Sequence, residues 1–500
     1  MADEQDQDGA GPSRRAALGL GMGLGAGAVG LAALSAGSAE AATAGGPVNK
    51  AVDVIVVGAG FAGLTAARKL RAAGKSVVVL EADDRVGGRT KAGTIAGEVV
   101  DLGGQWVGPT QTHLLALAKE LGVATYPQYA DGKNIADFAG HRAAYEGEIP
   151  ALDEAAMADF GEALGRFETL AASIPATRYW EAPNAAELDA QTMDGWILAN
   201  TRTAGARSIF RLGLRALLCA EAHEVSLLCV AAYAHSGGSF ATLIGTRGGA
   251  QDAVFEGGVW QLAAKMATAL GGAVVLDAPV KSIAQDAQGV TVTTPKGRWR
   301  ARQVVVTAPP ALAARIDYDP PLPALRDGLT QRLPLGSVIK IHIAYARPFW
   351  REQGLTGMVF SDRADFGPWF DHSPQKGEGE HGKTGGLVGF LAGAPARHWA
   401  DRPAEERRAQ VLKDIAVYFG EPALSPIAYL DEVWNRHPLH RGGYVSAPGP
   451  GVLTAYGPAL LEPVGRIHWA GTETADAWTG YIDGAIRSGE RVAAEVGALV

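Results

Sequence analysis

A single lysine interrupts an otherwise apolar run in the second half of the chain. The run Val338-Ile339-Lys340-Ile341-His342-Ile343 predicts a strand. A buried ammonium without a partner would be costly, and burial would lower its pKa and let the amine hold a water by hydrogen bonding. Strand alternation puts Val338, Lys340, His342 and Ala344 on one face, which could instead be solvated. The residues alone favour that second interpretation.

A glycine pattern near the start of the chain is suited to binding phosphate groups. Gly58-Ala59-Gly60-Phe61-Ala62-Gly63 lies between a predicted strand, 53–57, and a predicted helix, 64–73. Glycines at this spacing permit a tight turn, close approach of the backbone to a pyrophosphate and close helix–strand packing. The helix start offers free N–H groups to phosphates. Glu81 follows the next strand, 77–80, where its carboxylate can accept hydrogen bonds from a ribose. The pattern predicts a dinucleotide site.

Two more glycine pairs follow the first motif. They are Arg85-Val86-Gly87-Gly88-Arg89-Thr90 and Asp101-Leu102-Gly103-Gly104-Gln105-Trp106. Paired glycines let backbone amides lie against a second stretch of a long cofactor, and Arg89 can pair with its pyrophosphate. The alternative is two loops in a glycine-rich chain. The combination favours FAD over a nicotinamide cofactor.

Four ordered blocks resemble the flavin-containing amine oxidases, specifically the monoamine oxidase branch. The blocks are Val86–Thr90, Asp101–Gly108 with Pro109-Thr110-Gln111, Leu335–Lys340, and Trp469–Thr474 continuing through Trp478–Tyr481. The resemblance covers residues 50 to 498. It implies FAD-dependent oxidation of an amine, above all a primary monoamine, to an imine and then an aldehyde. Oxygen would be reduced to hydrogen peroxide.

The resemblance also assigns roles to individual residues. Lys340 would hold a water at flavin N5, which reverses the interpretation from the residues alone. Tyr481 would form one wall of an aromatic cage before the flavin, and Trp434 would flank the flavin ring; for both, plain core packing is the alternative. No metal is expected. The expected cofactor contacts are Gly58, Gly60, Phe61, Ala62, Gly63, Glu81, Ala82, Gly88, Arg89, Thr90, Gly104, Gln105, Trp106, Val280, Gly471, Thr472, Glu473, Tyr481 and Ile482.

The chain departs from the family pattern at one place. Gly442-Gly443-Tyr444-Val445 stands where the mitochondrial-type relatives have Gly-Gly-Cys-Tyr. Without that thiol, FAD is expected to be held non-covalently. Val445 cannot serve as an aromatic wall, and Tyr444 would point to the opposite side if the segment is extended. The cage is therefore expected to be half open.

The predicted fold is α/β, with a discontinuous Rossmann-like FAD-binding domain and an interleaved α+β substrate domain. The first would comprise residues 50–127, 255–328 and 438–498, and the second residues 128–254 and 329–437. Expected helices include 154–173, 185–200, 211–234, 404–419 and 481–499; expected strands include 273–276, 290–294, 299–301, 304–307, 338–345 and 467–469, with a hairpin turn at Pro295-Lys296-Gly297 and a mobile loop at 377–386.

Composition excludes several classes of protein. The 500 residues carry a net charge of −8 without any basic stretch, so we expect no nucleic-acid partner. The expected partners are a small-molecule amine and O2, with a homodimer left open. If Cys219 and Cys229 both lie on helix 211–234, they are about 15 Å apart along its axis, too far for a disulfide. They then serve as buried apolar groups.

The first residues predict export rather than a part of the fold. Ser13-Arg14-Arg15-Ala16-Ala17-Leu18 resembles a twin-arginine signal, and residues 16–37 are weakly apolar. Small-x-small cleavage sites occur at 39–41 and 42–44. Residues 1–44 are therefore predicted to be a signal peptide, giving a secreted or periplasmic protein with no stable membrane anchor after cleavage. An uncleaved N-terminal anchor is the alternative.

Other functions on the same scaffold remain open. An L-amino-acid oxidase needs an arginine for the substrate carboxylate, and Arg207, Arg211 and Arg247 are candidates. A polyamine or diamine oxidase needs acids along its tunnel. A flavin desaturase or protoporphyrinogen-oxidase-like enzyme would share the glycine motifs without needing Lys340 or Tyr481. A non-catalytic flavin carrier is a fourth alternative. His223 is interpreted as structural.

Overall fold

The computed structural model describes residues 48–150, 152–363, 365–374 and 384–500. In this part of the chain, β1 (Val48–Val57) is an interior strand of an eight-stranded sheet and pairs in parallel with β2 (Val77–Leu80) and β13 (Gly297–Val306). Its central residues, Val54–Val56, are fully buried, as expected for a strand covered on both faces. The strand order is β10 (Val274–Val275), β2, β1, β13, β12 (Gly289–Thr294), β11 (Ser282–Asp286) and β14 (Asp317–Asp319), with β20 (Ile467–Trp469) also paired to β13.

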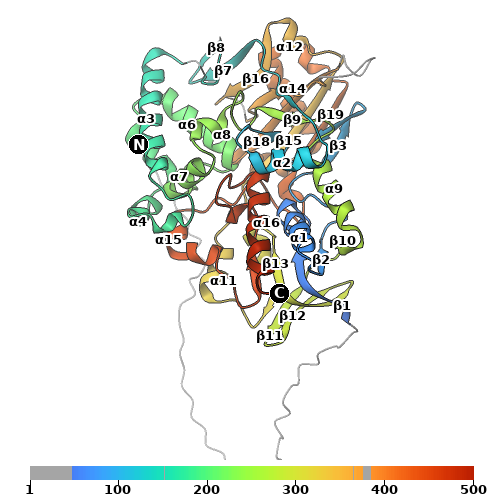
Figure 1. Ribbon diagram of the computed structural model, residues 1–500. Coiled ribbons are helices and arrows are strands. Elements are labelled where there is room, and N and C mark those ends of the chain that lie inside the picture. The colour runs from blue at the N-terminus through green and yellow to red at the C-terminus, as the bar shows by residue number, and fades with distance from the viewer. Residues whose placement is uncertain (1–47, 151, 364, 375–383) are drawn as a thin grey trace, which may run out of the picture. The chain divides into compact units, whose positions relative to one another are not determined.

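Helix α1 (Phe61–Ala72) leaves the end of β1 and lies beside α16 (Ile482–Gly497), so the two ends of the described fold meet (Figure 1). The helices approach closely: a Cβ at Gly489 would lie 2.4 Å from the carbonyl oxygen of Ala62. Helix α1 begins three residues before the expected start, because the last part of the glycine motif already forms its first turn.

A seven-stranded sheet is built around β15 (Val338–Tyr345), which has the predicted bounds and is buried along its whole length. Its Ile339, Ile341 and Ile343 pack in one core with α14 (Ala404–Phe419), a helix that also has the predicted bounds. The opposite face carries Lys340 and His342 and is buried too, so its interpretation as a solvated face is wrong. The strand order is β19 (Ala428–Val433), β15, β18 (Gly385–Ala392), β17 (Trp369–Asp371), β16 (Leu355–Ser361), β7 (Lys133–Phe138) and β8 (His141–Tyr145).

Helices between residues 154 and 244 form a separate apolar cluster. The expected helix 211–234 is wrong, because Cys219 adopts a left-handed conformation (φ 53°) that ends one helix, and the Ser226 side chain caps the start of the next. The expected helix 185–200 is likewise two helices, the second capped by Thr192. The helices are α3 (Glu154–Ala172), α4 (Ala185–Asp189), α5 (Met193–Asn200), α6 (Ala204–Leu218), α7 (Leu227–Ser236) and α8 (Phe240–Ile244).

Shorter elements complete the described chain. Two small sheets contain β3 (Ala92–Ile95) with β4 (Glu98–Asp101), and β5 (Trp106–Val107) with β9 (Ala253–Phe255) and β6 (Thr125–Pro127). The remaining helices are α2 (Thr112–Glu120), α9 (Trp260–Leu270), α10 (Pro310–Ala313), α11 (Ala324–Thr330), α12 (Phe349–Glu352), α13 (Ala394–Ala400) and α15 (Val452–Tyr456).

The predicted hairpin is confirmed, since Thr294 pairs with Gly297 across it. Strands 299–301 and 304–307 are wrong as separate elements, because β13 runs without a break from residue 297 to 306. Of the predicted loop 377–386, residues 377–383 lie outside the described chain, and Gly385 and Gly386 begin β18. The predicted signal peptide also lies outside it. Within the described residues, no helix has the length and apolar character needed to cross a membrane.

The two large sheets draw on different parts of the sequence. The strands of the eight-stranded sheet lie in segments 50–127, 255–328 and 438–498, apart from the first two residues of β1. The strands of the seven-stranded sheet all lie in segments 128–254 and 329–437. The described residues nevertheless belong to one compact unit. The division into two domains therefore stays a prediction.

Candidate active site

The glycine motifs from distant parts of the chain line one cavity of about 630 Å³. Of the site residues expected from sequence, only Gly63 and Glu473 do not line it. Those that do are Gly58, Gly60, Phe61, Ala62, Glu81, Ala82, Gly88, Arg89, Thr90, Gly104, Gln105, Trp106, Val280, Lys340, Trp434, Gly471, Thr472, Tyr481 and Ile482.

Both exceptions support residues that line the cavity. A Cβ at Gly63 would lie 2.0 Å from the carbonyl oxygen of Gly58, so glycine is what lets residues 58–63, the glycine turn, close on itself. Glu473 is buried and accepts two hydrogen bonds from the Arg89 guanidinium, at 2.7 and 3.1 Å. Arg89 also donates to the carbonyl oxygen of Tyr444 at 2.7 Å. Glu473 therefore acts through Arg89, because its carboxylate holds the Arg89 guanidinium in position.

The end of the cavity near β2 fits a dinucleotide. Gly60 and Gly88 face each other so closely that a Cβ at Gly88 would lie 3.4 Å from the Cα of Gly60. The start of α1 at Gly60 has no side-chain cap, as expected where N–H groups are offered to phosphates. Glu81 accepts hydrogen bonds from the backbone N–H groups of Ala59 (2.5 Å) and Asp83 (2.9 Å), which ties β2 to the glycine turn. Burial raises the pKa of Glu81.

Lys340 reaches the cavity from the middle of β15. Its Nζ donates to the carbonyl oxygen of Gly103 at 2.7 Å and to Oε1 of Gln105 at 2.5 Å. It also lies 5.3 Å from the centre of the Trp106 ring and 5.7 Å from that of Phe390. The strand is rigid and Gly103 belongs to the second glycine pair, so folding alone brings the amine to the cofactor loops.

Lys340 belongs to a buried polar group that we call the lysine cluster: Asp101, Gln105, Lys340, His342 and His372. Burial lowers the pKa of Lys340 from its ordinary 10.5, against the attraction of Asp101. Burial likewise raises the pKa of Asp101, whose carboxylate accepts from the backbone of Val259 and Trp260. Because its hydrogen-bond acceptors are both neutral carbonyl oxygens, the amine is not held in its charged form by a direct ion pair.

The histidines of the lysine cluster are neutral. His342 approaches the carbonyl oxygen of Asp101 at 3.0 Å, and His372 approaches Nε2 of Gln105 at 3.4 Å. Burial lowers the pKa of His372 to about 4 and that of His342 well below its usual range. Because the amide nitrogen of Gln105 is directed toward Nδ1 of His372, the amide oxygen faces Lys340.

Aromatic rings surround the middle of the cavity. Trp434 is buried and donates from its indole to the carbonyl oxygen of Leu102 at 2.9 Å. Trp106 packs against Phe370 and Phe390, with ring centres 5.2 and 5.9 Å apart. Tyr481 immediately precedes α16 and stacks on Tyr233 at 6.1 Å. Aromatic faces of this kind suit an amine.

The expected orientation of Tyr444 is wrong. Tyr444 lines the same cavity as Tyr481 and meets Phe390 edge to face at 6.0 Å, whereas Val445 is buried in the helical core. The segment is not a strand, so the alternation on which the expectation rested does not apply. Tyr444 and Tyr481 therefore both line the cavity.

The part of the cavity away from the glycine turn is mostly apolar. It includes Ile209, Leu212, Leu217, Leu243 and Phe360. The three candidate arginines do not line it. Arg207 donates to Thr201, Arg211 makes a paired contact with Asp194, and Arg247 contacts Asp131.

Several contributors could not be recognised from the sequence. The sequence predicts Gln105 only as a cofactor contact and gives no sign of a role for His372. His223 lies on a turn rather than a helix, is exposed and does not line the cavity, so its structural role stays a prediction. Neither cysteine lines it either, and both described cysteines are free. One local signal was overlooked, the spacing His437-Pro438-Leu439-His440.

The fold and this cavity define an FAD-binding oxidoreductase, and similarity to known proteins gives the family. Residues 61–497 match the family of flavin containing amine oxidoreductases. The Mycobacterium tuberculosis protein AofH, named as a flavin-containing monoamine oxidase, is 42% identical over 449 residues, covering 90% of this chain and 97% of its own. An L-amino acid dehydrogenase of Synechocystis is 40% identical over 461 residues, covering 90% and 95%.

Solved structures agree with this assignment. Putrescine oxidase bound to putrescine has a TM-score of 0.86 at 37% identity, covering 90% of this chain and 99% of its own. Cyclohexylamine oxidase from Brevibacterium oxydans has a TM-score of 0.84 at 33% identity, with the same coverage. The chain belongs to the flavin-containing amine oxidase family, with FAD as its cofactor and amine oxidation as its reaction. The absence of a cysteine from the described cavity lining is consistent with non-covalent FAD.

Proposed function

We propose that this enzyme oxidises apolar primary monoamines and passes the electrons to O2, forming hydrogen peroxide. The observation that carries the proposal is the apolar character of the part of the cavity away from the glycine turn, which includes Ile209, Leu212, Leu217, Leu243 and Phe360. There the described lining offers one ionic side chain, Glu148, and its two oxygens already accept from the backbone N–H groups of Thr246 (2.7 Å) and Arg247 (3.1 Å). An amino-acid carboxylate finds no arginine there, and the second ammonium of a diamine finds only Glu148, each of whose oxygens already accepts one hydrogen bond.

The apolar walls, two tyrosine rings and Lys340 each prepare the reaction that bound FAD would carry out. Bound FAD supplies the oxidising chemistry, accepting two electrons and hydrogen from the carbon next to the amine. The apolar walls favour the neutral amine over its ammonium form, because burial disfavours the charge. The rings of Tyr481 and Tyr444 orient the amine, and Lys340 holds a water. An imine released from this cavity is hydrolysed by water to the aldehyde.

The presence of both Lys340 and Tyr481 in the cavity lining favours an oxidase over a desaturase-like enzyme, which needs neither. Putrescine oxidase and the L-amino acid dehydrogenase are similar to this chain, so a diamine or an amino acid is the second candidate substrate. Glu148 is the observation that favours a diamine.

A substrate panel tests the proposal. The purified holoenzyme is supplied with a phenylalkylamine, an n-alkylamine, putrescine and L-phenylalanine, and peroxide release and flavin bleaching are followed. We expect kcat/KM for the aromatic monoamine to exceed that for putrescine and L-phenylalanine at least tenfold. Glu148→Gln should leave that ratio unchanged. A higher kcat/KM for putrescine that falls in Glu148→Gln would show a diamine oxidase, and flavin bleaching without peroxide would show a different electron acceptor.

We also propose that residues 1–44 direct export by the twin-arginine route, on the support of the Arg14-Arg15 pattern and the small-residue cleavage sites. Replacing both arginines by lysine should retain the folded yellow protein inside the producing cell. Export of the double variant at an unchanged level would contradict the proposal. The two-domain division and a homodimer stay predictions.

A further inference from the structure

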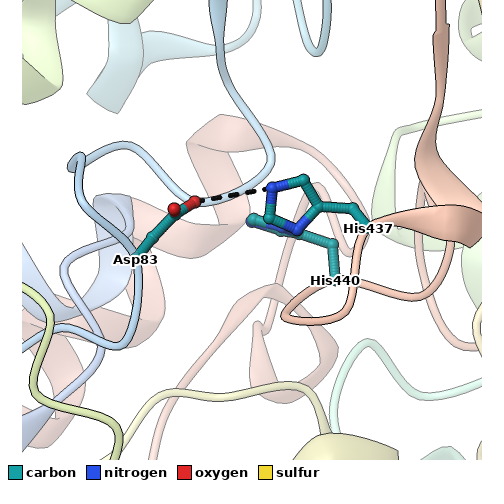
Figure 2. Close-up of side chains that lie close together, drawn as sticks. All are labelled: Asp83, His437 and His440. Carbon is teal, nitrogen blue, oxygen red and sulfur yellow. Dashed lines mark hydrogen bonds and ion pairs between the residues drawn. The ribbon is translucent and has the colours of Figure 1, made fainter.

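Two histidines and an aspartate lie close together at the edge of the cofactor cavity, whose lining includes His440. Asp83 follows β2, and His437 and His440 lie on a turn more than 350 residues later (Figure 2). One ligand atom from each lies within 4.8 Å of the other two. Oδ2 of Asp83 is 3.7 Å from Nε2 of His437, whereas the Nδ1 atom of His437 forms a hydrogen bond of 2.8 Å with Nδ1 of His440, which an ion would have to replace. We propose that Asp83, His437 and His440 bind a divalent transition-metal ion.

The local backbone brings the two imidazoles together. The N–H of His440 donates to the carbonyl oxygen of His437 at 3.1 Å, closing a turn around Pro438 and Leu439. Histidines three residues apart on a closed turn project on the same side. The Trp434 ring packs against both of them, at 6.4 and 5.1 Å between centres, which limits their rotation.

The ligands have the outer contacts that metal ligands usually have. His440 is buried and makes a further hydrogen bond to the backbone of Gly88. Oδ1 of Asp83 accepts from the N–H of Asp84 at 3.0 Å, while Oδ2 is buried without a hydrogen-bond donor. Contacts of this kind orient His440 and Asp83 and leave Oδ2 of Asp83 for the metal.

The donor set selects the class of ion. Two imidazoles and one carboxylate are suited to Zn²⁺, Co²⁺ or Ni²⁺ rather than Mg²⁺ or Ca²⁺, which prefer oxygen. Burial lowers the pKa of both histidines, that of His440 to about 3, so the rings are neutral ligands at pH 7. Arg85 is the competing cation, with its Nε 3.3 Å from Oδ2 of Asp83. Its other nitrogens are committed to carbonyl oxygens of the loop 86–90, so it can remain there as an outer contact.

The site would join two parts of the cofactor cavity. Asp83 is two residues from Glu81, which contacts the glycine turn, and His440 is four residues before Tyr444. A bound ion would tie these segments together. It would therefore stabilise the holoenzyme without taking part in amine oxidation.

The proposal is tested by metal binding to the FAD-loaded enzyme. Chelator-treated holoenzyme is titrated with Zn²⁺ by calorimetry, in parallel with His437→Gln, Asp83→Asn and the exposed-histidine control His141→Gln. We expect one Zn²⁺ per chain in the wild type and the control, with at least tenfold weaker binding in the other two. The Tm should rise with Zn²⁺ only where binding is retained. Flavin absorbance before titration confirms that each variant is folded and loaded.

Two outcomes would overturn the proposal. One is the absence of a saturable site in the wild type at Zn²⁺ concentrations of ~100 μM, far above those at which structural sites fill. The other is unchanged binding in His437→Gln, which would place the ion elsewhere. If a variant fails to load FAD, X-ray absorption of the wild-type zinc complex decides. Two imidazoles at ~2.0–2.1 Å with one carboxylate oxygen support the site, whereas a shell of sulfur or of water alone contradicts it.

Discussion

The glycine turn and the lysine cluster contribute to one cavity but are built in opposite ways. The turn is six consecutive residues that lead from the end of β1 into the start of α1, and its function depends on missing side chains. The cluster draws Asp101, Gln105, Lys340, His342 and His372 from distant segments, and its properties depend on burial. A change in the turn should therefore affect binding of the cofactor as a whole. A change in the cluster should affect chemistry while the cofactor stays bound.

The largest effect is expected for Gly63→Ala. The added Cβ would lie 2.0 Å from the carbonyl oxygen of Gly58, so the turn must open and the start of α1 must move. We expect the FAD content of the purified protein, from the ratio of absorbance at the flavin and protein bands, to fall by ~90% or more, consistent with severe overpacking. Gly161→Ala on α3 is the control, because a Cβ there meets nothing within 4 Å. Full FAD loading of Gly63→Ala would show that the turn tolerates a side chain.

Lys340→Met should separate binding from chemistry. Methionine fills similar space without a nitrogen, so FAD should remain bound while reoxidation of the reduced flavin slows by ~10²-fold, the lower range for a positioned acid–base group. Stopped-flow mixing of the reduced enzyme with oxygen measures the rate. Lys265→Met on α9 is the control, since Lys265 contacts only a surface carbonyl oxygen. An unchanged rate in Lys340→Met would remove the role of the lysine.

The pH dependence of stability should reveal the buried amine directly. Because the pKa of Lys340 is lowered in the folded state, the unfolded chain binds a proton that the folded one lacks between the lowered value and 10.5. In that interval the Lys340 contribution makes wild-type stability rise with pH, by ~1.4 kcal/mol per unit. The advantage of Lys340→Met in the free energy of unfolding should be largest below the lowered pKa and shrink as pH rises. Denaturant titrations between pH 6 and 9 measure it; a constant difference would mean that the lysine keeps its ordinary pKa.

The smallest effect is expected for Gln105→Leu. Lys340 loses one acceptor but keeps the carbonyl oxygen of Gly103 at 2.7 Å. One hydrogen bond of this kind contributes ~0.5–1.5 kcal/mol, so reoxidation should change by roughly two- to twelvefold with FAD retained. A loss as large as that in Lys340→Met would mean that Gln105, rather than Gly103, sets the position of the amine.

Elements whose pattern is local were predictable. Strands β2, β15 and β20 and helix α14 have the predicted bounds, because a continuous apolar run or a helical period reports directly on burial. The helix expected over 211–234 failed, since Cys219 in a left-handed conformation and the cap at Ser226 give little signal within an apolar stretch. The prediction for the direction of the Tyr444 side chain was wrong for a similar reason, because the residue lies in an irregular loop.

The sequence by itself determined the family, the cofactor and most of the residues around it, because the glycine motifs act through short-range geometry that their spacing encodes. Only the tertiary structure decided that Lys340 is buried against Gly103 and Gln105, that Tyr444 shares the cavity with Tyr481, and that Asp83 meets His437 and His440. These facts depend on which face of an element is covered and by which distant segment. Burial and contacts between distant segments change the pKa and the hydrogen bonding of these side chains. A local sequence pattern therefore cannot predict them.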